Sequence, residues 1–125
     1  MVGTMQQKVM ADFYEKVFEK KPDMSEDNWS GWMVGSSFFS IGEHSEMNGT
    51  AKDAGRLMFN LETKQVKEEF ERISKIDGTK VIKAPYEMSA EGEISPETGG
   101  GGMWIATLAD PDGNYFQLMS PWEGK

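Results

Sequence analysis

The feature that most constrains the fold of this chain is the tetrapeptide Asp-Pro-Asp-Gly at positions 110–113, which separates two apolar stretches. Proline presets the φ that the second position of a tight turn requires, and glycine accepts a positive φ at the end of the turn. The flanking residues, 103–109 and 115–119, are mainly aromatic, aliphatic or β-branched. This pattern predicts two strands joined by a tight turn, which together form a closing β-hairpin.

The rest of the chain predicts one arrangement of elements that occurs twice. Apolar residues recur at helical spacing over residues 6–18, and a second helix is expected to begin at Thr63 and to end near Gly78. Pro85 places one strand at a sheet edge. The strands are expected at residues 2–4, 29–34, 37–41, 56–61 and 80–86, with loops at 42–53 and 87–102. The order strand, helix, strands therefore occurs twice, which indicates an α+β fold.

The closing hairpin, in which Asp-Pro-Asp-Gly-Asn precedes an aromatic-rich strand, resembles the last two strands of the vicinal oxygen chelate superfamily. That superfamily includes glyoxalase I, bleomycin-resistance proteins and extradiol dioxygenases. The resemblance implies a glyoxalase-like fold of two βαβββ modules, at about 1–50 and 54–121, which form a half-open mixed β-barrel with the helices outside. It also implies a single domain over 1–125 and a homodimer, because superfamily members cover exposed strand edges by pairing or swapping modules.

The metalloenzymes of the superfamily take one metal ligand from each of four strands. In this chain the first strand has no histidine or carboxylate, Arg56 stands at the start of the second module, and Gln117 stands where a carboxylate is usual. A guanidinium cannot ligate a metal, and a neutral amide is a weak ligand. We therefore expect no metal and no cofactor. Glu43, His44 and Gln117 remain the possible donors of a non-standard metal site.

Strand alternation predicts which side chains face a ligand cavity on the concave side of the barrel. It places Arg56 and Met58 on one face of their strand, and it places Tyr115 and Gln117 opposite Phe116 on the last strand. Plain core packing remains the alternative for the aromatic and methionine residues, a structural ion pair for Arg56, and an ordinary loop position for His44. The candidate ligand-binding residues are Arg56, Met58, Trp104, Tyr115, Gln117 and His44. Which of Met103 and Trp104 faces the cavity stays open, because a bulge among the preceding glycines would change the register of this strand.

The overall charge excludes several kinds of partner. The 125 residues carry a net charge of −8, which repels phosphate backbones and anionic membranes. No apolar run is long enough to cross a bilayer, no signal peptide is visible, and the chain has no cysteine. We therefore expect a cytoplasmic protein that binds neither nucleic acid nor membranes.

Two functions fit these observations. The first is a small-molecule-binding protein that needs no metal and resembles the bleomycin-resistance branch, whose members bind cationic drugs. The acidic charge favours a cationic ligand, whereas Arg56 disfavours a purely cationic one. The alternative is a glyoxalase-like lyase, or another enzyme that acts on a small carbonyl or aromatic substrate through an atypical metal site. The sequence assigns no catalytic residue.

Overall fold

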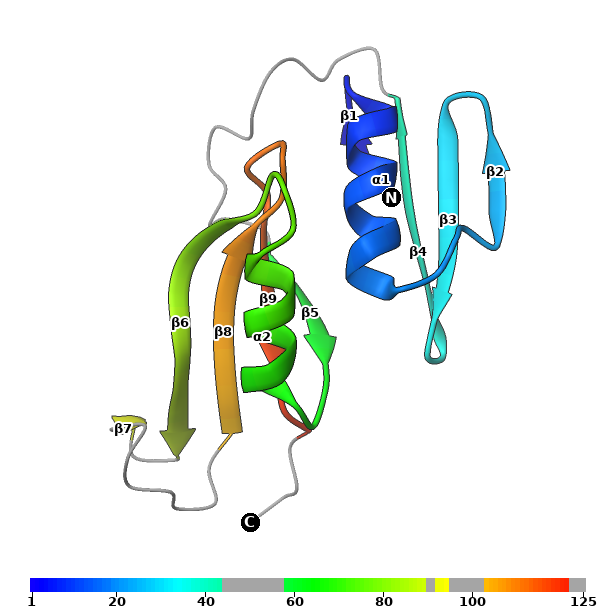
Figure 1. Ribbon diagram of the computed structural model, residues 1–125. Coiled ribbons are helices and arrows are strands. Elements are labelled where there is room, and N and C mark those ends of the chain that lie inside the picture. Colours follow the sequence, from blue (N-terminus) through cyan, green and yellow to red (C-terminus); the bar gives the residue numbers. More distant parts are fainter. Residues whose placement is uncertain (44–57, 90–91, 95–102, 122–125) are drawn as a thin grey trace.

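The computed structural model describes residues 1–43, 58–89, 92–94 and 103–121 (Figure 1). The first half of the chain contains β1 (Val2–Thr4), α1 (Gln7–Phe18), β2 (Met24–Glu26), β3 (Trp29–Val34) and β4 (Ser37–Glu43). The second half contains β5 (Phe59–Glu62), α2 (Val66–Ser74), β6 (Lys80–Ser89), β7 (Gly92–Ile94), β8 (Met103–Ala109) and β9 (Tyr115–Met119). The predicted repetition of strand, helix and strands is therefore present.

The two halves form two mixed sheets of the same topology. The first sheet has the strand order β1-β4-β3-β2, and the second has the order β5-β9-β8-β6-β7. In each sheet the first strand of the half runs parallel to the last strand, and the other pairs are antiparallel. The sheets lie side by side, each with its helix against one face (Figure 1). This arrangement confirms the predicted α+β, glyoxalase-like fold, whose barrel is half-open.

The helix-facing side chains of both sheets form one apolar core. Along β9, Phe116 and Leu118 are buried against the helices, whereas Tyr115 and Gln117 on the other face are only half-buried. This alternation confirms the predicted facing of the last strand. The other buried members of the core are Met10, Phe13, Tyr14, Val17, Trp32, Ile41, Val66, Ile73, Ala106 and Leu108. Because both halves contribute, neither sheet has a separate core.

Several element boundaries differ from the predictions. The strand expected at 80–86 continues to Ser89, because register shifts on either side of Lys83 accommodate Pro85 without ending the ladder. β7 lies in the stretch predicted to be a loop. The second helix begins at Val66 and ends at Ser74, so Gly78 takes its positive φ of 96° in the turn beyond the helix. β4 extends to Glu43, which was expected to follow the strand.

β2 was not predicted, since its residues Met24–Glu26 are all exposed and carry no alternating pattern. The strand expected at 56–61 is represented by β5 from Phe59 onward, and Arg56 lies outside the described residues. In the part of the chain that the structure describes, no helix is long and apolar enough to cross a membrane.

The turn of the closing hairpin anchors the first helix to the second sheet. The buried hydroxyl of Tyr14 in α1 donates a hydrogen bond of 2.6 Å to Oδ2 of Asp110. Asp110 also accepts hydrogen bonds from the backbone N–H groups of Asp112 and Asn114 and from the Asn114 amide. At the start of the same helix, Nε2 of Gln6 donates to Oδ1 of Asp112 over 2.5 Å. Both aspartates of the tetrapeptide therefore link the two halves.

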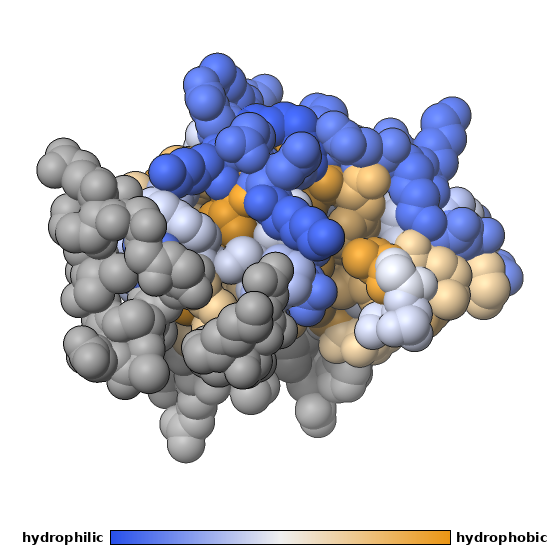
Figure 2. Space-filling view, turned by 90° about the horizontal axis from the view of Figure 1, so that it is seen from below, coloured by the Kyte–Doolittle hydropathy of each residue, from blue (hydrophilic) through white to orange (hydrophobic). Residues whose placement is uncertain are grey.

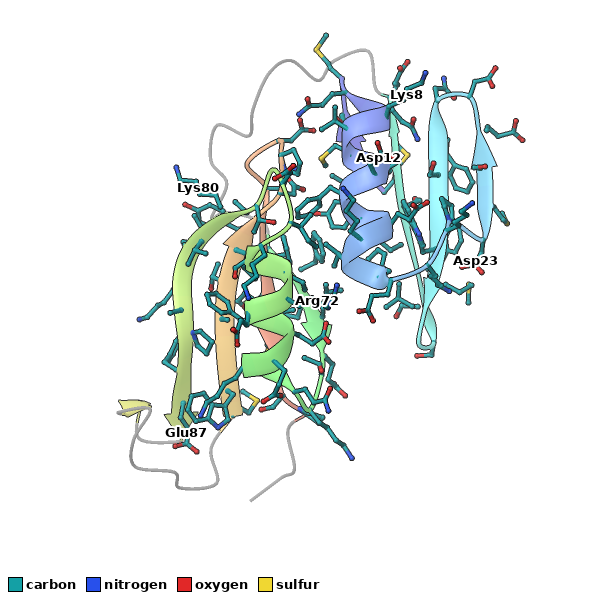
Figure 3. The ribbon with its side chains drawn as sticks, viewed as in Figure 1. Lys8, Asp12, Asp23, Arg72, Lys80 and Glu87 are labelled. Atoms are coloured by element: carbon teal, nitrogen blue, oxygen red, sulfur yellow. The ribbon has the colours of Figure 1, made fainter. Side chains whose placement is uncertain are left out.

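A second link joins the two helices. Arg72 of α2 points toward the end of α1 (Figure 3), where its guanidinium donates to the carbonyl oxygens of Lys16 and Val17, each over 2.8 Å. These carbonyls belong to the last turn of α1, whose acceptors have no partner within the helix. Arg72 also pairs with Glu69 and Glu19. This arginine thus caps one helix from the other.

Tyr14→Phe tests the anchor, because it removes one donor from the buried Asp110 carboxylate and keeps the ring. We expect the free energy of unfolding at pH 7 to fall by about 1–3 kcal/mol, which is the scale of one lost hydrogen bond to a charged group. Urea unfolding measures this difference. A loss no larger than that of Tyr86→Phe, at a half-buried tyrosine outside the core, would contradict the anchoring role.

The same variant should change the dependence of stability on alkaline pH. Burial, aided by the neighbouring Asp110 charge, raises the pKa of Tyr14 well above its ordinary value. Above about pH 10 the unfolded chain therefore loses a proton that the folded protein keeps, and this group lowers wild-type stability by up to about 1.4 kcal/mol per pH unit. Tyr14→Phe lacks this group, so its stability deficit should narrow between pH 9.5 and 11. A constant deficit would contradict the prediction.

Candidate functional site

Each sheet has one face that its helix covers and one face that we call helix-free. The cross-strand register assigns side chains to these faces, because opposite residues lie on the same side. On the first sheet, Trp29 lies opposite Gly42, Gly31 opposite Ser40 and Met33 opposite Phe38, all on the helix-free face. On the second sheet this face carries Ile105, Thr107, Tyr115, Gln117 and Met119. In Figure 1 both helices lie on the same side of their sheets, so both helix-free faces open on the other side.

The helix-free face of the first sheet carries an aromatic platform. The ring centroids of Trp29 and Phe38 lie 5.9 Å apart, with an angle of 32° between the ring planes. The Phe38 ring lies over Gly31, where an added Cβ would come within 2.3 Å of Phe38 Cζ. Glycine is therefore required for the ring to take this position. Phe38 and Met33 remain 45% and 48% exposed, so the platform can contact a ligand or another protein surface.

The helix-free face of the second sheet is more polar. Nε2 of Gln117 donates a hydrogen bond of 3.3 Å to Oγ1 of Thr107 on the neighbouring strand. The half-buried Tyr115 lies on the same face of β9. Farther across the sheet, Nζ of Lys83 lies 4.3 Å from the ring centroid of Tyr86. This face therefore offers an amide, a phenol and a cation, which can fix polar groups of a ligand.

Trp104 does not lie with Tyr115 and Gln117. The hairpin register places it on the same face as Ala106 and Leu108, where it packs against the core. Nζ of Lys67 in α2 lies 4.0 Å from its ring centroid, in cation–π contact. Met103, the adjacent residue, takes the helix-free face by alternation. Sequence alone left this choice open, because the register of the strand depends on the residues before it.

The other sequence candidates are only partly placed. Met58 is 46% exposed and immediately precedes β5. Arg56 and His44 lie outside the described residues. Trp29 and Phe38 were not among the candidate ligand-binding residues, although their strands were predicted. The signal that could have identified them is the alternation of Trp29, Gly31 and Met33, in which the small residue leaves room for a ring.

The described residues do not provide the donor set that the superfamily metal requires. On β1, the Thr4 hydroxyl is buried and accepts a hydrogen bond from the backbone N–H of Gln6. Glu43 lies at the exposed end of β4 in the first sheet, whereas the Gln117 amide lies in the second. Within residues 1–43, 58–89, 92–94 and 103–121, no three His, Cys, Asp or Glu side chains gather as a metal site would need.

Known proteins share the architecture without close sequence similarity. No family model and no curated protein matches the sequence. A glyoxalase/bleomycin resistance protein from Albidiferax ferrireducens T118 is 19% identical, with a TM-score of 0.68 over 97% of this chain and 95% of that one. A glyoxalase/bleomycin resistance protein/dioxygenase family enzyme from Burkholderia phytofirmans PsJN is 22% identical, with a TM-score of 0.69 over 95% of this chain and 93% of that one.

A third similar structure is a bleomycin-binding protein complexed with bleomycin. It is 16% identical to this chain and has a TM-score of 0.61, over 97% of this chain and 94% of that one. At these identities the likeness establishes the fold. The chain therefore has the glyoxalase/bleomycin-resistance fold, and the resemblance to the vicinal oxygen chelate superfamily is confirmed at that level.

Gly31→Ala tests the aromatic platform. The added methyl group occupies the space of the Phe38 ring and should displace this ring from Trp29. Because Phe38 is half-exposed and can move outward, we expect the free energy of unfolding to fall by only about 1 kcal/mol. The near-ultraviolet circular dichroism of the aromatic pair should change clearly. Ser40→Ala, which alters the opposite residue without filling that space, is the control, and identical spectra for both variants would contradict the platform.

Proposed function

We propose that this protein binds a planar small molecule against the helix-free faces, without a metal of the superfamily type. The observation that carries the proposal is that one sheet presents the partly exposed Trp29–Phe38 platform and the other presents the Gln117–Thr107 pair. Aromatic rings stack on planar ligands, and a small number of polar groups fix the orientation of the ligand. The fold of the bleomycin-binding protein supports this choice.

We further propose that the binding unit is a homodimer and that residues 1–125 form one domain of two modules. Both helix-free faces of one chain open on the same side, so they cannot cover each other (Figure 1). In a two-fold symmetric dimer, the second sheet of each chain could lie over the first sheet of the other chain. This arrangement would enclose two half-open barrels. The exposed apolar residues Met24, Met33 and Phe38 would then be covered. In this proposal Arg56, Met58 and His44 contribute to the rim of the ligand cavity.

The ligand prediction uses bleomycin, the ligand of the structural neighbour, and a panel of planar aromatic cations and neutral compounds. A bound compound should quench tryptophan fluorescence through Trp29. Gln117→Leu keeps the shape of the side chain but removes its amide, so binding should weaken by about 1–2 kcal/mol. Gln65→Leu, which changes an exposed glutamine at the start of α2, is the control. Equal affinity of the two variants would exclude this face as the site, and chemical turnover of a bound compound would favour the enzyme alternative.

The dimer prediction uses two apolar residues of similar exposure. Light scattering should give about twice the chain mass of 14.0 kDa. Phe38→Glu should yield a monomer, because it places a charge in the proposed interface. Val9→Glu adds the same charge on α1, at a residue that is 49% exposed compared with 45% for Phe38, and should leave the dimer intact. A wild-type monomer at tens of micromolar would contradict the proposal.

A further inference from the structure

A groove lies at the boundary between the two sheets. It has a volume of about 550 Å³ and is lined by residues 34–39 on one side and by Phe59–Glu62 of β5 on the other. Phe39 and Phe59 meet across its floor with ring centroids 5.2 Å apart, and both rings also contact Tyr14. Figure 2 views the molecule from the end where the β3–β4 turn lies and shows apolar residues exposed among hydrophilic ones. Phe38, Asn60 and Glu62 line the groove and also lie on the helix-free faces, so the groove borders those faces.

The ladder between β1 and β4 stops at this groove. Val2, Gly3 and Thr4 pair in parallel with Ile41, Gly42 and Glu43. β4 begins at Ser37, so its residues 37–40 continue the same edge toward the groove without a partner among the described strands. The unoccupied edge is therefore in line with β1 and is long enough for a short parallel strand.

The opposite wall of the groove also presents a backbone edge. β5 pairs with β9 only, among the strands that the structure describes. The backbone N–H of Thr63 donates to Met119 of β9, so by alternation the backbone groups of Asn60 and Glu62 point away from β9. Among the described strands the two edges belong to separate sheets and do not pair with each other, and the Phe39 and Phe59 rings pack between the sheets with centroids 5.2 Å apart. A strand inserted between the two edges could pair with both.

These two edges lack the protection that another edge of the molecule has. Along most of β6 the strand carries Lys80, Lys83 and Pro85, and two register shifts in its ladder with β8 distort it. Natural sheets use such features to prevent an outer edge from pairing with other chains. Residues 37–40 of β4 carry neither charge nor proline, and Glu62 is the single charged residue of β5. The unprotected edges therefore favour strand addition as the mode of recognition.

We propose that the groove binds an extended peptide of a partner protein, which runs parallel to β4 in line with β1 and joins the two sheets. The register specifies its side chains. Residues that face the floor must be small, because the Phe39 and Phe59 rings already meet there. The residue beside Phe38 faces outward and is apolar, and the first residue of the peptide lies beside the exposed Glu62 and is basic. The sequence Lys-Ala-Val-Ala satisfies these conditions.

The test is a titration of the ¹⁵N-labelled protein with acetylated, amidated Lys-Ala-Val-Ala, followed by the backbone amide resonances. Shifts should saturate and should be largest at residues 37–40 and 59–62. The same peptide with N-methyl groups on its two central amides should bind at least about tenfold more weakly, because it cannot form the ladder. Absence of saturable shifts, shifts centred on β6 or on Thr107 and Gln117, or equal binding of the methylated peptide would overturn the proposal.

Matched variants separate backbone pairing from side-chain effects. Asn60→Pro removes an N–H that faces the groove, and should weaken binding at least about tenfold, whereas Asn60→Ala keeps that N–H and should change affinity less than about twofold. The melting temperatures of both variants must match that of the wild type within a few degrees. If Asn60→Pro does not fold, Glu62→Gln replaces it, and the affinity for the peptide in low salt should then fall two- to tenfold. A wild-type dimer that Asn60→Pro dissociates would identify a second copy of this chain as the occupant and would overturn the peptide proposal.

Addition of the same four residues before Met1 provides an independent test. By the register of β1, this extension should occupy the groove from within the chain, raise the melting temperature and block the free peptide. The control is an extension of four residues with proline at the two alanine positions. It should neither raise the melting temperature nor block binding of the free peptide. An extension that leaves both the melting temperature and the peptide affinity unchanged would contradict strand addition at this edge.

Discussion

The hydrogen bond between Tyr14 and Asp110 is the interaction on which the rest of this structure depends. A carboxylate buried at the boundary of two sheets is costly unless several donors satisfy it. Here Tyr14 supplies one donor from the first half of the chain, and the turn around Asn114 supplies the others. Burial still raises the pKa of Asp110, and these hydrogen bonds only partly offset that effect. The geometry of the turn and the position of α1 are therefore set by the same side chain.

The fold could be predicted from the sequence because the signals were local. The tetrapeptide at 110–113 fixed the hairpin: Gly113 takes a φ of 83°, and its N–H donates to the Asp110 carbonyl as in a tight turn. The apolar spacing of the first helix was likewise sufficient. The role of the two turn aspartates could not be predicted, since their partners, Gln6 and Tyr14, lie about a hundred residues away in the sequence. No local pattern contains that pairing.

The candidate site could be predicted only in part, for a related reason. Alternation correctly placed Tyr115 and Gln117 opposite Phe116, because the hairpin turn fixes the register of β9. The direction in which Trp104 points depends on the pairing of β8 with β9. The sequence left open whether Met103 or Trp104 lies on the helix-free face, and the pairing places Met103 there. The Trp29–Phe38 contact depends on the empty space above Gly31, which becomes apparent only when the strands are paired. Side-chain facing thus follows from register, and register is a tertiary property.

Among the residues that the structure describes, side chains join the two sheets and no backbone ladder does. Tyr14, Phe39 and Phe59 pack beneath the boundary, and Arg72 binds the end of α1 beside it. The core therefore closes without using the backbone groups of β5 that point away from β9, or those of residues 37–40 of β4 that point away from β3, and no described strand pairs with these groups. An added strand can satisfy these groups without moving any core residue. In this fold the interactions that hold the modules together are consequently separate from those that a partner would use, so recognition at the groove need not cost stability.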